Sequence, residues 1–318
     1  MRKLAALVLP LCMGFSSAGR AANSEGPRTF HIAMSASIFT GVNENDARAA
    51  MKAWAIGVIK QRKLDLGIEV LVYRNLSELT SALRSQQLDA FTISVAEYFS
   101  LESKIGPCTL FGAQYGPSIG ETYVLLAHEG GAIQKLSDLR GRTLVLQGDV
   151  RGCLAIPWLD ELGMQAAGRP LSQFCRKVDS SPKPGQVVLP VFFRQADACV
   201  VTQKVFATMS ELNPQIGKSL RVLASSREFI PVILCVRHTL DPKRMEMVLD
   251  ALRHLHESPE GRQSLNNFGT ERMIELQPSD LNSTRMLFWN VRGSRAPEAP
   301  NGAGSDPAAS VSQIGGGH

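Results

Sequence analysis

The sequence predicts an α/β protein built from two similar lobes, because two motifs repeat along its 318 residues. The first is a Gln-x-Asp-Ala frame followed by an apolar run, a hydroxyl residue and, four positions later, an aromatic residue. It begins at Gln87 and again at Gln195, and each copy is typical of a buried strand that ends at the start of a helix. The second is a strand that starts with Arg-Thr, at Arg28 and at Arg142. Two such halves indicate two lobes with a ligand cleft between them.

Residues 1–21 are predicted to be a secretory signal peptide. Basic residues precede an apolar stretch at 4–15, and the small residues that follow place the cleavage after Ala21. A retained membrane anchor is the alternative, but Pro10 interrupts the apolar stretch, which is short for a bilayer. Cleavage removes three positive charges and lowers the formal net charge from +5 to +2. We therefore expect a periplasmic protein without a nucleic-acid partner.

Five cysteines remain after cleavage, and exported proteins can carry disulfides. Cys199 and Cys235 lie in apolar strand patterns and are predicted to be buried thiols. Cys153 and Cys175 fall in the same predicted lobe, and their spacing leaves open whether they pair. The sequence has no CxxC and no zinc-site pattern, so we expect neither a metal nor a cofactor.

The first lobe is expected over residues 28–126. A strand at 29–34 runs through a loop rich in Ser, Thr and Gly into a helix whose N-cap is Asn43 or Asn45. A strand at residues 68–73 and a helix at residues 76–84 follow. The first copy of the repeated strand comes next. This alternation favours a mainly parallel sheet with right-handed crossovers. The apolar segment 123–127 is interpreted as a strand that leaves the lobe.

The second lobe is expected over residues 127–223. It begins with a helix-like segment at residues 133–139 and a strand at 143–146. A loop at 148–152 and a helix around Trp158 follow. Residues 179–185 are rich in Ser and Pro, which predicts a loop. Segment 187–193, before the second copy of the repeated strand, has the composition of a strand.

The chain is expected to return to the first lobe over residues 224–292. Segments 220–224 and 230–236 are predicted to be returning strands, so that two crossings form a hinge. Pro242 at a first-turn position, followed by apolar residues at spacings of three and four, then indicates a helix. Residues 293–318 are mostly Gly, Ser, Pro, Ala and Asn and are predicted to be a disordered tail.

Four short segments together resemble one protein family. Residues 137–143 (Ser-Asp-Leu-Arg-Gly-Arg-Thr) are similar to the start of the second lobe in periplasmic solute-binding proteins, and residues 258–262 (Ser-Pro-Glu-Gly-Arg) are similar to a helix start near their C-terminus. Residues 189–198 and 211–215 are similar to a divergent branch of the group. The order and spacing of these four segments, over residues 30–288, resemble those of the phosphate, phosphite and phosphonate binding components of ABC transporters.

The resemblance implies a type 2 periplasmic binding protein fold, in which each lobe is a mainly parallel sheet flanked by helices and a two-segment hinge joins them. It also implies a monomer that closes around a small anionic ligand, such as a phosphonate or another oxyanion. The partner that it implies is an ABC permease in the inner membrane.

One segment departs from this family pattern. Members that clamp a phosphonate usually open the first helix of the second lobe with a loop rich in Ser, Thr and Gly. Here residues 148–153 provide an acid and no hydroxyl. An anion can still bind through Arg151 and backbone N–H groups, whereas Asp149 works against it. Phosphonate is therefore what the family implies, not what these residues indicate.

Ligands of open α/β sheets bind beyond the carboxyl ends of the strands, where loops enter helices. Helix N-termini at such loops suit an anionic or zwitterionic molecule. The candidate ligand-binding residues in these loops are Ser37, Phe39, Thr40, Ser94, Glu97, Tyr98, Gln147, Asp149, Arg151 and Thr202.

Each candidate also has a purely structural interpretation. Ser94 and Thr202 either contact the ligand or cap their own helices, a role that contributes about 1 kcal/mol. The two aromatic candidates either form an apolar wall or belong to the core. Arg151 either grips a carboxylate or phosphate bidentately or is a solvated loop residue. Glu97 either discourages anions or pairs with an amine of the ligand.

We therefore predict a solute-binding protein that serves an ABC transporter. The alternatives are a sensory module that presents its ligand to a signalling receptor and, less favoured, an enzyme on the same scaffold. No G-x-S-x-G or Walker pattern is present, and nothing links a histidine to a Ser or Cys nucleophile. We expect no enzymatic activity.

Overall fold

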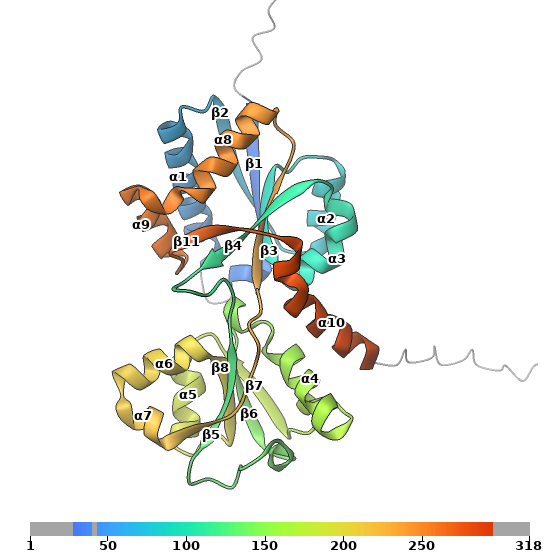
Figure 1. Cartoon of the computed structure of the whole chain (residues 1–318), viewed down its shortest axis with the longest axis vertical. Helices are drawn as coiled ribbons and strands as arrows, with labels where there is room; N and C mark the ends of the chain where they lie inside the picture. Colours follow the sequence, from blue (N-terminus) through green and yellow to red (C-terminus); the bar gives the residue numbers. More distant parts are fainter. Residues whose placement is uncertain (1–27, 40–42, 295–318) are drawn as a thin grey trace, which may run out of the picture.

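The computed structural model describes residues 28–39 and 43–294, which form two α/β lobes joined by two chain crossings (Figure 1). The predicted signal peptide, Thr40 and the part of the predicted tail beyond residue 294 lie outside the described residues. Within those ranges, no helix combines the length and the apolar character needed to cross a membrane.

The first lobe is built on a six-stranded sheet. From one edge to the other, its strands are β11 (Arg272–Leu276), β4 (Cys108–Gln114), β10 (Val232–Arg237), β3 (Ala90–Ser94), β1 (Arg28–Ser35) and β2 (Leu66–Tyr73). β1 is parallel to β2 and β3, whereas β10 is antiparallel to β3 and β4. The residues of β1 alternate between two apolar clusters, with Ala33 in one and Ile32 and Met34 in the other. Helices therefore have to cover both faces of this sheet.

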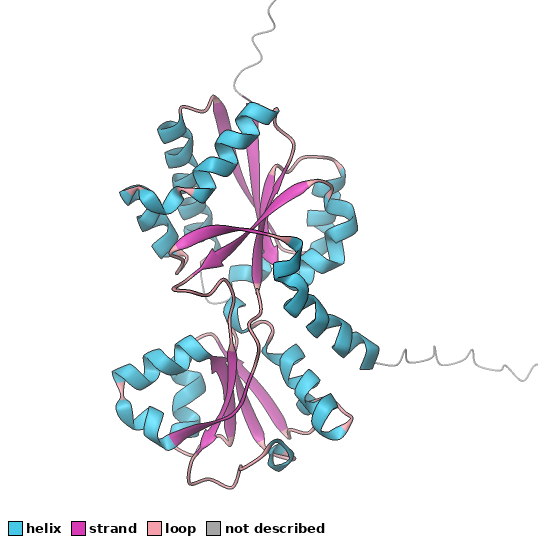
Figure 2. Cartoon of the chain, viewed as in Figure 1, coloured by secondary structure: helices cyan, strands magenta, loops and turns pink. Residues whose placement is uncertain are grey.

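Two groups of helices provide that cover (Figure 2). One face is covered by α1 (Glu44–Arg62), α8 (Pro242–Arg253) and α9 (Pro259–Asn267), and the other by α2 (Leu76–Arg84) and α3 (Val95–Ile105). The short η1 (Ala36–Phe39), η5 (Leu255–Glu257) and η6 (Pro278–Leu281) complete the lobe. The helix α10 (Asn282–Ser294) leads away from it and packs on α4 (Ala155–Ala167) of the second lobe. Asn43 caps α1 by accepting from the N–H groups of Asn45 and Asp46, which confirms one of the two predicted caps.

The second lobe is built on a five-stranded sheet. Its strands are, in order, β7 (Lys177–Ser181), β6 (Thr143–Gln147), β8 (Ala198–Thr202), β5 (Tyr123–His128) and β9 (Leu220–Ser225). Its helices are α4 (Ala155–Ala167) on one face and α5 (Pro184–Phe192), α6 (Gln203–Leu212) and α7 (Pro214–Ser219) on the other, with short turns at η2 (Leu136–Leu139), η3 (Val150–Gly152) and η4 (Leu171–Gln173). The predicted two-lobed α/β class is confirmed, and both sheets are mixed. β6 is parallel to β7 and β8, as β1 is to β2 and β3, whereas β5 is antiparallel to β8 and β9 and β11 is antiparallel to β4.

Segment 187–193 is mainly helical, so the prediction of a strand was wrong. Pro184 lies in the first turn of α5, where a missing N–H costs nothing. Val187, Val188 and Val191 are buried at helical spacing against the sheet. Packing of these valines on the sheet overrides their preference for strands.

Two further segments of this lobe differ from the prediction. In segment 133–139, residues 133–135 are not helical and the last four residues form only the short 3-10 turn η2. The predicted Ser/Pro loop from residue 179 overlaps β7, which pairs in parallel with β6. β7 is an edge strand whose residues are mostly polar and mostly exposed, so it lacks the apolar pattern that identifies a buried strand.

The lobes meet a few residues away from the expected boundaries. β5 and β9 pair with each other in the second sheet, whereas the sequence placed residues 123–126 in the first lobe and interpreted 220–224 as returning to it. At the hinge, Glu121 and Phe229 exchange backbone hydrogen bonds of 2.7 and 3.0 Å. A Cβ on Gly120 would lie 2.5 Å from the Phe229 carbonyl oxygen, so the two crossing segments approach closely because residue 120 is glycine.

The repeated motifs occupy equivalent positions in the two lobes. Asp89 accepts from the N–H of His31 at 2.8 Å, and Asp197 accepts from the N–H of Thr143 at 2.8 Å. Each aspartate also pairs with an arginine at the start of that strand, Asp89 with Arg28 of β1 and Asp197 with Arg142, just before β6. The Gln-x-Asp-Ala frame thus fastens the repeated strand to its parallel neighbour in both halves.

One apolar cluster runs through both lobes on the side of α3 and α4. At the hinge its members include Tyr123, which stacks on Trp158 with 6.1 Å between ring centroids and packs against Phe229 at 6.2 Å. All three side chains are buried. The lobes are therefore joined by packed aromatic rings as well as by two chain segments.

All five cysteines of the described residues are free. Cys199 and Cys235 are buried, and burial raises the pKa of both thiols, as expected for thiols that act as small apolar residues. Cys153 and Cys175 are not paired with each other.

Candidate functional site

Glu97 is the centre of the polar contacts at the rim of the first lobe. Its carboxylate accepts hydrogen bonds from the hydroxyls of Ser35 (2.6 Å), Ser37 (2.8 Å) and Ser94 (2.8 Å). It also accepts from the backbone N–H of Ser94 at 2.9 Å. Ser35 and Ser94 end the parallel strands β1 and β3, which is why they meet at one edge of the sheet. Ser94 and Glu97 together form the capping box of α3.

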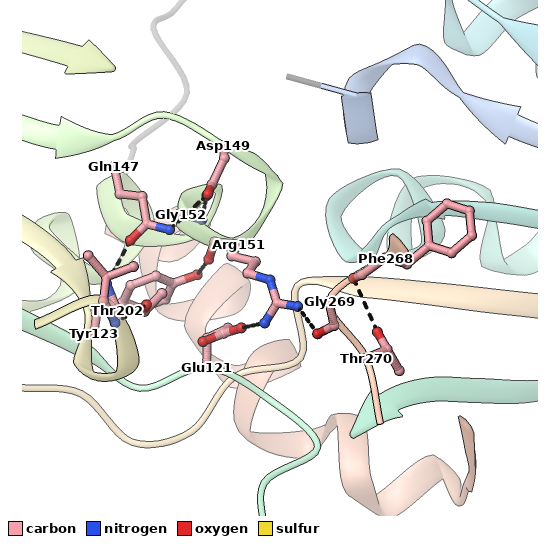
Figure 3. A network of polar contacts seen from close by, with 11 residues as sticks. Glu121, Tyr123, Gln147, Asp149, Arg151, Gly152, Thr202, Phe268, Gly269 and Thr270 are labelled. Atoms are coloured by element: carbon pink, nitrogen blue, oxygen red, sulfur yellow. Dashed lines mark hydrogen bonds and ion pairs between the residues drawn. The ribbon is translucent and has the colours of Figure 1, made fainter. Parts of the chain in front are cut away.

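Asp149 has a similar place in the second lobe (Figure 3). Its carboxylate accepts from the N–H of Gly152 at 3.0 Å and from Nε2 of Gln147 at 2.9 and 3.0 Å. Oε1 of Gln147 accepts from the N–H of Thr202 at 2.9 Å. The Thr202 hydroxyl accepts from the N–H of Val205 and so caps α6. The ends of β6 and β8 and the turn η3 are thereby joined into one network.

In each lobe, a carboxylate of the protein itself thus occupies donors at the start of a helix. Such donors normally form an anion site, but here they are bonded to Glu97 and Asp149. A ligand anion has to displace one of these carboxylates before it reaches the donors. A hydrogen-bond donor or a cationic group of a ligand can bind to the carboxylates directly.

Arg151 connects the two lobes (Figure 3). Its Nη1 donates to Oε1 of Glu121 at the hinge at 2.6 Å, and its Nη2 donates to the carbonyl oxygen of Gly269 in the first lobe at 2.6 Å. Its own carbonyl oxygen accepts from the Tyr123 hydroxyl. Arg151 is therefore held in a fixed position between the lobes and is not a solvated loop residue.

Burial and charge shift two pKa values around Arg151. Burial raises the pKa of the Glu121 carboxyl, and the positive charge of Arg151 opposes that shift. Burial and the nearby Arg151 lower the pKa of the Lys204 ammonium, which lies 2.8 Å from the ring centroid of Tyr115. The lobe boundary thus holds opposite charges in a partly dehydrated setting, where they interact more strongly than in water.

The structure divides the polar candidates from the sequence between two rims. The first rim carries Ser37, Ser94 and Glu97, and the second carries Gln147, Asp149, Arg151 and Thr202. η1 of the first rim contacts η3 of the second, so the two rims lie against each other at the boundary between the lobes. Ser94 and Thr202 both cap their own helices, as one of the two interpretations expected.

The side chains of the two aromatic candidates pack in the apolar clusters of the first lobe and take no part in the polar network of its rim. Tyr98 is 7% exposed and belongs to the core, where its hydroxyl contacts Glu102 at 3.4 Å. Burial, together with the charge of Glu102, raises the pKa of Tyr98. Phe39 packs against the apolar cluster of the first lobe.

Sequence reasoning missed Ser35, Glu121 and Gly269. Ser35 directly follows the predicted strand 29–34 and lies two positions before the candidate Ser37, so the end of that strand is the signal that identifies it. Glu121 and Gly269 contact Arg151 from 30 and 118 positions away in the chain, and no local pattern signals such contacts.

A family described as the phosphonate periplasmic substrate-binding protein of ABC transporters matches residues 59–281. No curated protein matches the sequence.

Similar solved structures include a Xanthomonas citri protein bound to ATP, with a TM-score of 0.60 and 16% identity, covering 84% of this chain and 98% of that one. A binding protein component of an ABC phosphonate transporter from Pseudomonas aeruginosa has a TM-score of 0.57 and 11% identity, covering 84% and 88%. PhnD1 from Prochlorococcus marinus, in complex with methylphosphonate, has a TM-score of 0.57 and 14% identity, covering 84% and 99%.

At these identities the solved structures show that the fold is shared. The family match covers more than half of the chain and includes both rims except Ser35 and Ser37. The chain therefore belongs to the family of periplasmic substrate-binding proteins of phosphonate ABC transporters, which bind small ligands and work with a permease.

Proposed function

We propose that this protein binds a phosphonate-type solute between its lobes, with the acid group at Arg151, and presents it to an ABC permease in the inner membrane. In this proposal the chain is exported with cleavage of residues 1–21, acts as a monomer and catalyses no reaction. The position of Arg151 between the lobes carries the proposal. A planar guanidinium can keep one N–H group on Glu121 while another donates to a phosphonate oxygen, because its donors are held in a fixed fork.

The partners of Arg151 support an exchange on binding. Its bond to Gly269 goes to a neutral carbonyl oxygen, and an anionic oxygen is a stronger acceptor. Glu121 remains as the second partner and keeps the guanidinium oriented. A phosphonate that replaces the Gly269 carbonyl therefore gains a charge-assisted bond while Arg151 stays in place.

The two rim carboxylates support a ligand that also carries a hydrogen-bond donor. A phosphonate monoanion has one P–OH group, which can donate to Glu97 or Asp149. A sulfonate has no such proton and meets both carboxylates as an acceptor only. We therefore expect the site to prefer phosphonates to sulfonates.

Calorimetric titration of residues 22–318 with methylphosphonate, inorganic phosphate and methanesulfonate tests the proposal. We expect methylphosphonate to bind more tightly than methanesulfonate. At a hundred times its dissociation constant it should stabilise the fold by about 2.7 kcal/mol, which a thermal melt detects.

Two variants locate the acid group. Arg151→Ala should weaken methylphosphonate binding at least tenfold, because it removes the charged donor to the acid group. Arg176→Ala is the matched control, since it removes an exposed arginine from the same lobe, just before β7 and at the opposite end of the sheet from η3. Equal loss in both variants, or unchanged binding in Arg151→Ala, contradicts the proposed site. Failure of every acid to bind contradicts the proposed function.

A further inference from the structure

A large cavity lies inside the first lobe, between one face of its sheet and the helices α1, α8 and α9. Its volume is about 560 Å³. Protein interiors are close-packed and contain few voids larger than a water molecule, whereas ligand pockets span roughly 300–1,000 Å³. The cavity therefore has the size of a ligand site and not that of a packing defect.

The walls of this lobe 1 cavity are apolar. On the sheet side they include alternate residues of β1 and β10, namely Phe30, Ile32, Met34, Leu234 and Val236. These side chains belong to one apolar cluster on a single face of the sheet. Apolar walls offer water few hydrogen-bond partners, so they favour a hydrocarbon occupant.

Small residues on α1 help to create the space. Ala47, Ala50 and Ala55 all line the cavity, at positions where a helix packed on a sheet normally presents larger apolar side chains. Met51 and Trp54 line the same wall. The helix therefore covers the sheet without filling the volume beneath it.

One end of the cavity is polar and lies at the boundary between the lobes. Glu121, Arg151 and Thr270 line this end, and Arg151 is the residue that joins the lobes. Gln114 also lines the cavity, and its buried Oε1 has no hydrogen-bond partner within the described residues. A buried polar atom without a partner is uncommon. The cavity thus joins a long apolar chamber to a cationic side chain at its mouth.

We propose that the ligand is a single-chain amphiphile, an alkylphosphonate whose acid group binds at Arg151 and whose alkyl chain fills the lobe 1 cavity. The inference rests on the proposed function for its headgroup. It adds that the chain of the ligand lies inside one lobe, under α1, and not in the cleft between the lobes. The cavity then selects ligands by chain length.

A series of alkylphosphonates from methyl to octyl tests this inference by calorimetric titration. Each methylene group that enters an apolar chamber should lower the dissociation constant about fourfold, which corresponds to about 0.8 kcal/mol. The decrease should stop once the cavity is full. Octanoate and octanol show whether the phosphonate headgroup is needed, and both should bind more weakly than octylphosphonate.

A pair of neighbouring alanines on α1 provides a matched comparison. Ala50→Phe places a ring in the cavity and should abolish the gain with chain length while methylphosphonate still binds. Ala49→Phe adds the same ring at an exposed position that does not line the cavity, and it should keep the gain. A gain that survives Ala50→Phe overturns the inference.

Fluorescence gives a second test that does not require a substitution that fills the cavity. Trp54 lines the chamber, so a brominated octylphosphonate should quench its emission in the unmodified chain. The quenching should be lost in Trp54→Phe, although Trp158 and Trp289 remain. Equal quenching in both proteins overturns the inference.

The outcomes separate this inference from the proposed function. Equal affinity of methylphosphonate and octylphosphonate overturns the inference and leaves the proposed function intact. Octanol that binds as tightly as octylphosphonate overturns the assignment of the acid group to Arg151. Failure of the whole series to bind overturns both.

Discussion

The guanidinium of Arg151, in the second lobe, donates a 2.6 Å hydrogen bond to the carbonyl oxygen of Gly269, in the first lobe. Gly269 has a φ of +59°, and a Cβ at this position would lie 3.0 Å from Nη2 of Arg151. The contact between the lobes therefore depends on a glycine in the left-handed region of the backbone.

Gly269→Ala should destabilise the fold by roughly 1–2 kcal/mol, because alanine is strained at this φ. It should also change ligand affinity, since the added methyl group presses on Arg151. Gly116→Ala is the matched control, because Gly116 has a φ of +60° and nothing near its Cβ position. Urea unfolding of both variants should show similar losses, and only Gly269→Ala should alter binding. An identical binding change in the two variants would argue against the Arg151 contact.

Glu121 should make the stability of the fold depend on pH. Its folded-state pKa is raised by burial, so the folded state holds the proton more tightly than the unfolded state. The stability from this group is fully present below the unfolded pKa and is lost as the pH rises through the raised folded pKa. Arg151→Ala removes the opposing charge and should extend this loss to higher pH. Chemical denaturation from below the unfolded pKa of Glu121 to above its folded pKa measures this loss of stability. Glu121→Gln should remove the part of the pH dependence that Glu121 causes.

Glu97→Gln should increase affinity for oxyanions, because the hydroxyls of Ser35 and Ser37 are then no longer bonded to an anion. It should also cost about 1 kcal/mol of stability by weakening the capping box of α3. Glu78→Gln is the control, since Glu78 has the equivalent position in the first turn of α2, where it accepts from Asn75. Titration with inorganic phosphate compares the two variants. Unchanged affinity in Glu97→Gln would show that this carboxylate does not compete with the ligand.

Arg285 should anchor α10 to α3. It forms two hydrogen bonds of 2.7 Å to Glu102 and lies over the ring of Phe99. Because the pair is partly exposed, Arg285→Ala should cost only about 0.5–1 kcal/mol. The bonds to Arg285 lower the pKa of Glu102, so this stability is present above the unfolded pKa and is lost as the pH falls through the folded pKa. Thermal melts of the variant should therefore differ from the parent at neutral pH and converge with it in acid.

The sequence predicted those parts of the fold and site that depend on local patterns. The apolar runs and turn residues located most strands, and the repeat placed Ser94 and Thr202 at equivalent helix starts. Segment 187–193 was predicted to be a strand because valine favours strands. Its valines lie in a helix because packing against the sheet outweighs that preference.

The remaining features arise from tertiary contacts that no short segment encodes. The pairing of Arg151 with Glu121 and Gly269 joins residues far apart in the chain. The lobe 1 cavity depends on alanines of α1 that face the sheet, and alanine in a helix carries no signal in a sequence because it is the residue that helices favour most.

The ring stack of Tyr123, Trp158 and Phe229 has a consequence for how the protein unfolds. Because these rings belong to one apolar cluster that extends through both lobes, neither lobe can lose its tertiary packing without exposing part of the core of the other. The two lobes should therefore melt as a single cooperative unit, with one calorimetric transition whose van't Hoff enthalpy equals the total enthalpy. Neither lobe expressed alone should then reach a stable native state.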